Sequence, residues 1–300
     1  MKWKVMLMAL SVVLMLCLVG CRAESGAEFE MYQSVVSDVT DNLAGVEAEV
    51  ASASGYFQKS EMEAVTKTIE FRGEQYCGRY EKSSKDWLNS YTTDIFCDET
   101  GIEFGLRADT GAIVSVNLMN KQFFETEPYL NELNDPETAL PLLAKEIAGD
   151  YVQGIDDYEM TAEEPTVRYK EKDGKSYRIS YHVFVFTREI QGFATSDMVY
   201  VKMTSKGNLA SIVLGDTGVF SGITLDFDGD LASTSMNQKV ADAYQKASYN
   251  ILDSSVEKQY LAVTPDGKVC LFTQVIVKIE DTSGNDVDTG IVIQTVVGQR

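Results

Sequence analysis

An internal repeat constrains the fold of this 300-residue chain more than any other feature of its sequence. Residues 72–80 match residues 173–181, and residues 104–118 match residues 200–214, with a glycine kept at the expected turns. The offset is 101 positions in the first match and 96 in the second, which places an insertion in the first copy within residues 81–89. Self-similarity of this kind indicates that one structural unit is repeated along the chain.

A third copy begins at residues 265–268, which match residues 172–175. In each copy, apolar residues at helical spacing precede segments that alternate as β-strands do. We expect helices over residues 31–50, from Pro136 and from Ser235. The third copy ends one strand short. The sequence therefore predicts an α+β fold of about three tandem units, each a helix packed on an antiparallel β-meander, with the last unit truncated.

This organisation divides the chain into five segments. Residues 1–20 form a signal peptide and residues 21–30 an acidic tether, and the three repeat units cover residues 31–134, 135–230 and 231–300.

The N-terminal segment predicts export and anchoring. Lys2 and Lys4 precede an uncharged apolar run over residues 5–19. As a helix this run rises roughly 22 Å, which is shorter than the roughly 30 Å hydrocarbon core of a bilayer. The run ends at residues 18–21, Leu-Val-Gly-Cys, which resemble the lipobox of bacterial lipoproteins. The resemblance implies cleavage before Cys21, a lipid such as palmitate on that residue, and a place on the extracytoplasmic face of the bacterial cell membrane.

The charge of the chain excludes one class of partner. The chain has 26 Lys and Arg against 46 Asp and Glu, a net charge of −20. Binding of nucleic acid requires clusters of basic side chains, so no nucleic-acid partner is expected.

A short turn motif resembles a family of envelope proteins. Residues 107–114 read Arg-Ala-Asp-Thr-Gly-Ala-Ile-Val, and residues 206–209 repeat the pattern more weakly. Tandem helix-and-meander units closed by such a turn, behind a lipobox, resemble PepSY-type and YcdB-type extracytoplasmic repeats. The resemblance implies PepSY-like, cystatin-like domains that bind or restrain envelope peptidases. It supplies no catalytic residues.

The residues that serve most often in catalysis do not form a recognisable set. His182 is the only histidine and lies in the middle of a predicted strand. Residues 218–222, around Ser221, miss the spacing of a nucleophile elbow by one residue. Nucleophilic catalysis needs a base beside the nucleophile, so we expect a protein that is not an enzyme and that uses no cofactor.

Three cysteines remain in the mature chain besides Cys21. A hairpin centred on Trp87 places Cys77 opposite Cys97, where a disulfide could form. A second register, with a turn at residues 98–101, separates the two thiols. Cys270 is expected to be a buried free thiol.

Asp226, Asp228 and Asp230 are the weaker candidates for a metal site. Gly229 stands fourth in this stretch and Asn237 twelfth, whereas a calcium loop of the EF-hand type needs Gly sixth and Glu twelfth. A solvated loop that leads into a helix explains the same residues, so we predict no metal.

Four tyrosines recur on one strand face in two copies, and two interpretations stay open. Tyr76 and Tyr80, like Tyr177 and Tyr181, are four residues apart. Such tyrosines form a binding face for a peptide or glycan, or they pack beneath the helix.

Together these features predict a membrane-anchored, non-catalytic lipoprotein that binds or inhibits an envelope protein, with a peptidase as one candidate. The alternative is a lipoprotein that binds a solute or a glycan.

Overall fold

The computed structural model describes most of the chain between residues 47 and 299. The described residues are 47–50, 55–85, 91–121, 123, 136–223, 225, 227–264, 267–280, 284 and 286–299. This part of the chain forms fifteen strands and two α-helices, and it divides into two compact units. Unit 1 holds the described residues of 55–189 together with residues 195–221. Unit 2 holds residues 47–50, residues 190–194 and the described residues from 222 onward.

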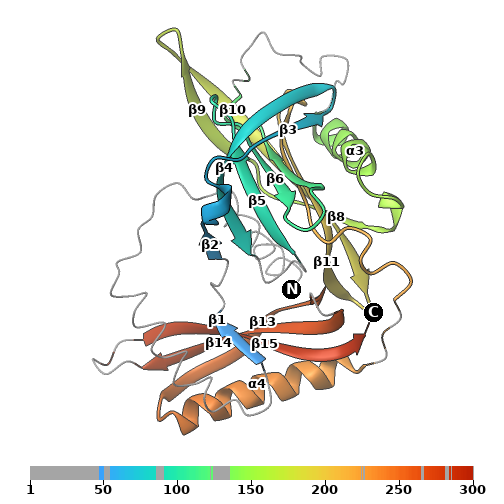
Figure 1. Ribbon diagram of the computed structural model, residues 1–300. Coiled ribbons are helices and arrows are strands. Elements are labelled where there is room, and N and C mark those ends of the chain that lie inside the picture. Colours follow the sequence, from blue (N-terminus) through green and yellow to red (C-terminus); the bar gives the residue numbers. More distant parts are fainter. Residues whose placement is uncertain are drawn as a thin grey trace. The chain divides into compact units, whose positions relative to one another are not determined.

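Unit 1 is an antiparallel sheet with one α-helix (Figure 1). Its elements are β2 (Gly55–Phe57), the 3₁₀-helix η1 (Ser60–Met62), β3 (Thr66–Phe71), β4 (Glu74–Lys85), β5 (Thr92–Cys97), β6 (Glu103–Arg107), β7 (Ile113–Asn117), α3 (Pro136–Gly149), the 3₁₀-helix η2 (Ile155–Asp157), β8 (Glu159–Ala162), β9 (Thr166–Lys172), β10 (Lys175–Ile190), β11 (Phe193–Thr204) and β12 (Leu209–Leu214). The order across the sheet is β10-β11-β12-β7-β6-β5-β4. Each outermost long strand carries two short strands: β2 and β3 pair with β4, and β8 and β9 pair with β10.

Unit 2 contains the second α-helix and a four-stranded antiparallel sheet. Its elements are β1 (Glu47–Val50), α4 (Gly229–Lys246), β13 (Asn250–Val263), β14 (Lys268–Glu280) and β15 (Asp286–Gln299). The strand order is β13-β14-β15-β1. The strand missing from the third copy is therefore supplied by β1, which precedes all the other described strands in the sequence.

Each unit has its own hydrophobic core. In unit 1, Leu140 and Ile147 of α3 belong to one buried cluster with Phe96 and Phe104, whose rings stack at 5.4 Å. In unit 2 the predicted helix face around Tyr244 packs on strands β14 and β15. Apolar residues at helical spacing and alternating strand residues thus meet as the sequence predicts, because each buries one apolar face.

The expectation of three tandem PepSY-like, cystatin-like units, each with its own helix on a meander, is wrong. Only two α-helices lie in the described residues, and strands dominate. The first two copies share the single sheet of unit 1, joined where β7 pairs with β12. The predicted boundary between residues 134 and 135 therefore falls inside unit 1. The boundary between residues 230 and 231 falls within α4.

The register of β7 with β12 explains why the two copies merge. Val116 lies opposite Ile212, and these two residues are equivalent positions of the repeat, 96 residues apart. A local two-fold axis therefore passes through this pair, as in a symmetric dimer interface. The last strand of a separate meander would leave an unpaired edge, and here each copy closes the edge of the other.

The predicted helix ends also differ from the observed ones. Most of the helix expected over residues 31–50 lies outside the described residues, and its last four residues form β1. The helix expected from Ser235 begins six residues earlier, at Gly229. Pro141 lies inside α3, which begins at Pro136 as expected.

Candidate functional site

The four tyrosines of the repeat do not form an exposed face. Tyr76, Tyr80 and Tyr181 are buried in the core of unit 1, and Tyr177 is half-buried. Tyr80 accepts a hydrogen bond from the backbone N–H of Lys59 at 3.1 Å. The packing interpretation fits these positions, and a glycan platform built on them loses three of its four rings to the core.

The cysteines lie apart or outside the described residues. Cys21 is outside them. Cys77 on β4 and Cys97 on β5 are both free thiols, and the register of this hairpin sets Arg79, not Cys77, opposite Cys97. Burial raises the pKa of the Cys97 thiol above its usual range, and nearby carboxylates act in the same direction. Cys270 is a buried thiol that forms no disulfide, as the sequence predicts, and it accepts a hydrogen bond from Gln294 Nε2 at 3.3 Å.

The acidic stretch before α4 is only partly described. Asp226 and the side chain of Asp230 lie outside the described residues, and Asp228 is exposed just before the helix begins. Among the side chains that the structure describes, no group of three or more His, Cys, Asp or Glu is placed to hold a metal ion.

His182 and Ser221 occupy different elements of unit 1. His182 is half-buried on β10, where desolvation lowers the pKa of its imidazole against the opposing effect of Glu137. Ser221 is exposed in a turn after β12, where its backbone N–H donates to Gly218 O at 3.1 Å.

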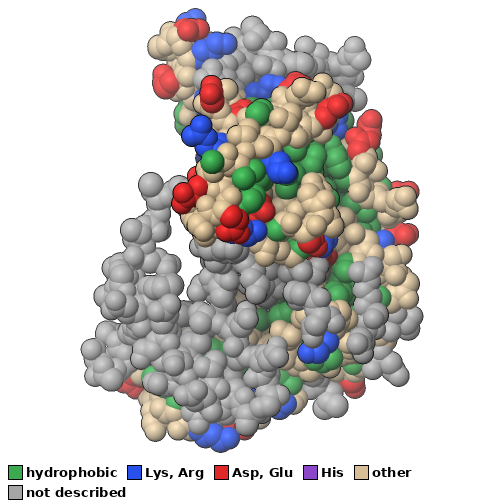
Figure 2. All heavy atoms as spheres, in the orientation of Figure 1, with side chains coloured by type: hydrophobic (Ala, Val, Ile, Leu, Met, Phe, Trp, Pro, Cys, Tyr) green, Lys and Arg blue, Asp and Glu red, His purple; other side chains and the backbone are tan. Residues whose placement is uncertain are grey.

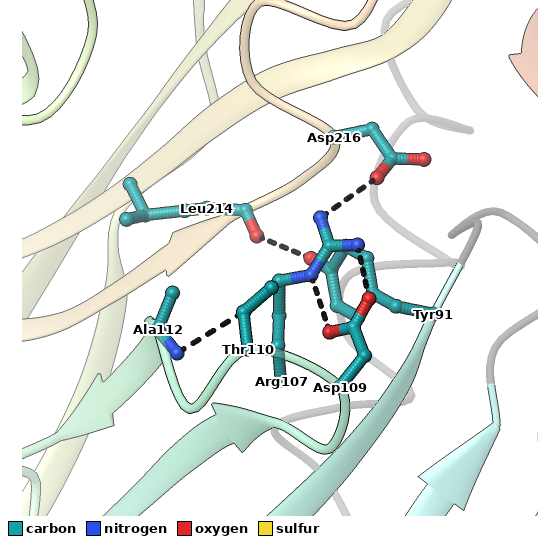
Figure 3. Close-up of polar contacts among 7 residues, drawn as sticks. All are labelled: Tyr91, Arg107, Asp109, Thr110, Ala112, Leu214 and Asp216. Atoms are coloured by element: carbon teal, nitrogen blue, oxygen red, sulfur yellow. Dashed lines mark hydrogen bonds and ion pairs between the residues drawn. The ribbon is translucent and has the colours of Figure 1, made fainter.

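The turn motif of residues 107–114 forms a cluster of ionic and aromatic contacts (Figure 3). Arg107 Nε and Nη2 donate to the two carboxylate oxygens of Asp109 at 3.0 and 2.9 Å. Arg107 Nη1 lies 3.9 Å from Oδ1 of the buried Asp216, and Arg107 Cζ lies 4.1 Å from the centroid of the Tyr91 ring. Tyr91 Oη donates to Leu214 O at 3.0 Å.

This cluster is structural. The hydrogen bond with Asp109 raises the pKa of Arg107, and Arg107 lowers the pKa of the Asp109 carboxyl. The guanidinium is thus already paired with carboxylates of its own chain. Because Asp216 follows β12 and Arg107 ends β6, the cluster joins the two copies of the repeat where β7 and β12 pair.

A second cluster of the same composition lies between β10 and β11. Asp197 is fully buried, accepts a hydrogen bond from Tyr158 Oη, and accepts another from Arg188 Nε at 3.1 Å. Arg188 Cζ lies 4.7 Å from the centroid of the Tyr158 ring. Burial, followed by the bond to Asp197, raises the pKa of Tyr158 to about 12. Two donors thus satisfy the buried carboxylate of Asp197, and this pairing occupies the guanidinium of Arg188.

The outer edge of β9 is the most accessible recognition feature of unit 1. Among the described strands, β9 pairs with β10 and with no other. Six of its seven residues are exposed, and Lys170 is half-buried. Tyr169 is 70% exposed and Val167 40% exposed, which is unusual for large apolar side chains on a strand. In Figure 1 the β9–β10 hairpin projects beyond the other strands of unit 1.

Hairpin geometry fixes which backbone groups of β9 face outward. Asp173 and Gly174 both have positive φ, 51° and 71°, so the two strands are joined by a two-residue type I′ turn. The residues that flank such a turn, Lys172 and Lys175, form a hydrogen-bonded pair, and bonded and non-bonded pairs alternate from there. Ser205 N donates to Ser180 O from β11, which agrees with this alternation.

It follows that three residues of β9 direct their backbone N–H and C=O groups away from β10. These are Val167, Tyr169 and Glu171. An outward ladder of this kind is the template onto which an additional strand can pair.

The hairpin is also basic, in contrast with the chain as a whole. Residues 166–178 contain five basic and two acidic side chains, whereas the net charge of the chain is −20. Figure 2 shows Lys and Arg side chains at the tip of this hairpin, with acidic ones among them. In the sequence, the Asp-Gly turn between two alternating segments indicates this hairpin. It does not indicate which strands lie beside the hairpin.

Comparison with known proteins returns no match: no protein family, no curated protein and no solved structure is significantly similar to this chain. None of the helices in the described residues is both long and apolar enough to cross a membrane.

Proposed function

We propose that this protein is a non-catalytic binding module, anchored by lipid on Cys21 at the extracytoplasmic face of a bacterial membrane. Its role is to capture an extended segment of another envelope protein on the outer edge of β9. The basic residues Lys2 and Lys4, the apolar run over residues 5–19 and the lipobox-like residues 18–21 support the anchor.

The single observation that carries the proposed binding is the outer edge of β9, since β10 is the one described strand with which β9 pairs. Val167, Tyr169 and Glu171 offer backbone donors and acceptors in the direction away from β10. A segment that adds here as a strand gains main-chain hydrogen bonds, and neighbouring side chains determine which segment fits.

Unit 2 contains an example of the same interaction within the chain. The four residues of β1 pair with Ile291–Gln294 at the edge of β15, although more than 200 residues of sequence separate them. A short extended segment is thus enough to cover a sheet edge in this fold.

The resemblance of residues 107–114 to PepSY-type repeats makes an envelope peptidase the first partner to test. The turn itself is occupied by its own ion pairs, so we place the partner at β9 and not at Arg107.

Site-specific cross-linking tests this function. A photo-cross-linking residue replaces Tyr169 in residues 22–300, and the same residue replaces Leu142, which is 66% exposed on α3, as the matched control. In an extract of the producing organism's envelope, we expect a cross-link from position 169 to one extended segment of one protein. Position 142 should give none.

A second variant asks whether the edge is the cause. Val167→Pro removes one outward N–H without removing a bond to β10, and Pro is tolerated at such edge positions. It should abolish the cross-link from position 169, whereas Val167→Thr, which keeps the N–H, should retain it. Equal cross-linking from positions 169 and 142, or a cross-link that survives Val167→Pro, would show that β9 does not capture a strand.

A further inference from the structure

We infer that the segment captured by β9 alternates acidic and apolar residues, an inference that rests on the proposed function and names the chemistry of its partner. The two faces of β9 differ sharply in character. An added strand presents successive side chains to these two faces in turn, because its side chains alternate as those of β9 do.

One face of β9 is basic. Arg168, Lys170 and Lys172 share it, and Arg168 and Lys172 are exposed. Lys170 is directed inward, where its Nζ donates to the carbonyl oxygens of Met119 and Lys121. Burial lowers the pKa of Lys170, with Arg168 acting in the same direction. Acidic side chains on the partner strand would lie beside Arg168 and Lys172, where opposite charges on neighbouring strands attract.

The other face of β9 is apolar at two of its three positions, and the third, Glu171, is acidic. Val167 and Tyr169 are on this face, and both are exposed large apolar side chains. A partner side chain between them would bury apolar area on both strands, which favours binding. Tyrosine is well suited to such contacts because it offers a large, rigid ring with a polar end.

Charge also explains why β9 would not pair with a second copy of itself. An antiparallel pair of β9 strands centred on Tyr169 sets Arg168 opposite Lys170 on both sides. Like charges directly opposite each other are unfavourable, and basic residues on an edge strand commonly prevent self-association. An acidic strand turns the same residues into attractive contacts.

The repeat supplies an internal comparison. The equivalent strand β3 is also joined to its neighbour by a two-residue turn with positive φ, at Arg72 and Gly73. In β3 the residue equivalent to Arg168 is Lys67. The other two residues on that face, Ile69 and Phe71, are buried, and Glu70 lies on the opposite face. β3 therefore lacks both the cluster of bases and the exposed apolar pair, and it serves as the control edge.

Binding of two designed peptides to residues 22–300 tests the inference. The acidic probe is acetyl-Thr-Glu-Val-Glu-Val-Glu-Thr-amide, and in the basic probe Lys replaces each Glu. We expect the acidic probe to bind at least about tenfold more tightly, with chemical-shift changes at the β9 amides. The double variant Arg168→Glu with Lys172→Glu should reverse this preference. Lys67→Glu, on β3, should change either affinity by less than about twofold.

Tyr169→Pro and Tyr169→Thr separate the possible failures. Tyr169→Pro should abolish binding of the acidic probe while leaving amide protection in α3 unchanged, and Tyr169→Thr, which keeps the backbone N–H, should retain measurable binding. If both probes bind equally and Tyr169→Pro abolishes both, the acidic preference is overturned and edge capture stands. If neither probe binds, or binding survives Tyr169→Pro, the inference is overturned, and cross-linking at position 169 decides the proposed function separately.

Discussion

Two buried aspartates, Asp197 and Asp216, each lie beside a guanidinium that also contacts a tyrosine ring. In both cases the arginine is partly exposed and the carboxylate is buried, so the arginine forms the boundary between core and solvent. Removing the arginine would take a partner from the buried carboxylate, which is costly. We therefore read both clusters as parts of the fold, and the recognition chemistry as belonging to β9.

Glu163 is a different kind of acid: the residue is half-buried, and its buried Oε1 has no hydrogen-bond partner among the described residues. Burial raises the pKa of its carboxyl to about 7, against the opposing effect of Lys202. Between the ordinary pKa of a glutamate and about pH 7, the folded state therefore holds a proton that the unfolded chain has already released. Stability from this group is greatest at low pH and is lost as the pH rises through 7.

Glu163→Gln should consequently stabilise the protein at about pH 8, by about 1–2 kcal/mol, and have no effect at about pH 4. Urea unfolding at the two pH values measures this difference. Glu164→Gln, at the exposed neighbouring position, is the control and should change the free energy of unfolding little at either pH. An equal gain at both pH values would argue against a buried, unpaired carboxylate.

The equivalent hairpins β3–β4 and β9–β10 carry different side chains on their outer strands. β3 and β9 are each joined to the next strand by the same kind of two-residue turn. Where β3 has the buried Ile69 and Phe71, β9 has two lysines. Where β9 has the exposed Val167 and Tyr169, β3 has two threonines. In unit 2, β1 covers the edge at β15, which is the position of the missing last strand and not the equivalent of the β9 edge.

The contribution of β1 can be measured with two adjacent prolines. Successive backbone N–H groups point alternately toward and away from the partner strand, so Ala48→Pro with Glu49→Pro must remove one bond to β15. We expect amide protection at residues 291–293 to fall by about 1–2 kcal/mol, while protection in the core of unit 1 stays unchanged. The double variant to Thr at the same positions should preserve it. Unchanged protection in the proline variant would mean that β1 does not stabilise β15.

At the scale of the whole molecule, charge is the dominant feature. A net charge of −20 opposes the compact state by self-repulsion and also keeps copies of the protein apart. An acidic partner is repelled by most of this chain but attracted by the local excess of basic side chains on the β9–β10 hairpin.

Salt should therefore act in opposite directions on folding and on binding. Raising NaCl from about 20 mM to about 200 mM shortens the screening length and should raise the Tm by about 2–5 °C, while it weakens binding of the acidic probe. Scanning calorimetry and a binding titration measure the two effects. At pH 4.4, the isoelectric point calculated from the sequence, the effect of salt on the Tm should nearly vanish. A Tm that ignores salt at neutral pH would show that self-repulsion is unimportant.

Local patterns in the sequence are enough to indicate single elements. Alternating residues indicate the strands β3, β10 and β14, and glycine turns indicate where these strands end. Helical spacing indicates which face of α4 is buried. The sequence could also show that two copies are alike. These properties depend on residues close together in the chain, so local patterns report them.

Which strand edges pair, and which strand faces are buried, can be seen in the folded structure but not in the sequence. The pairing of β7 with β12 joins two copies into one sheet. β1 pairs with β15, although the two strands are far apart in the sequence. Tyr181 became core while Tyr169 stayed exposed, although both lie on alternating strands. Alternation shows which side chains share a face of a strand, but the neighbours of that strand are set by contacts between distant residues. For the same reason, the sequence alone could not show that β10 is the one described strand with which β9 pairs.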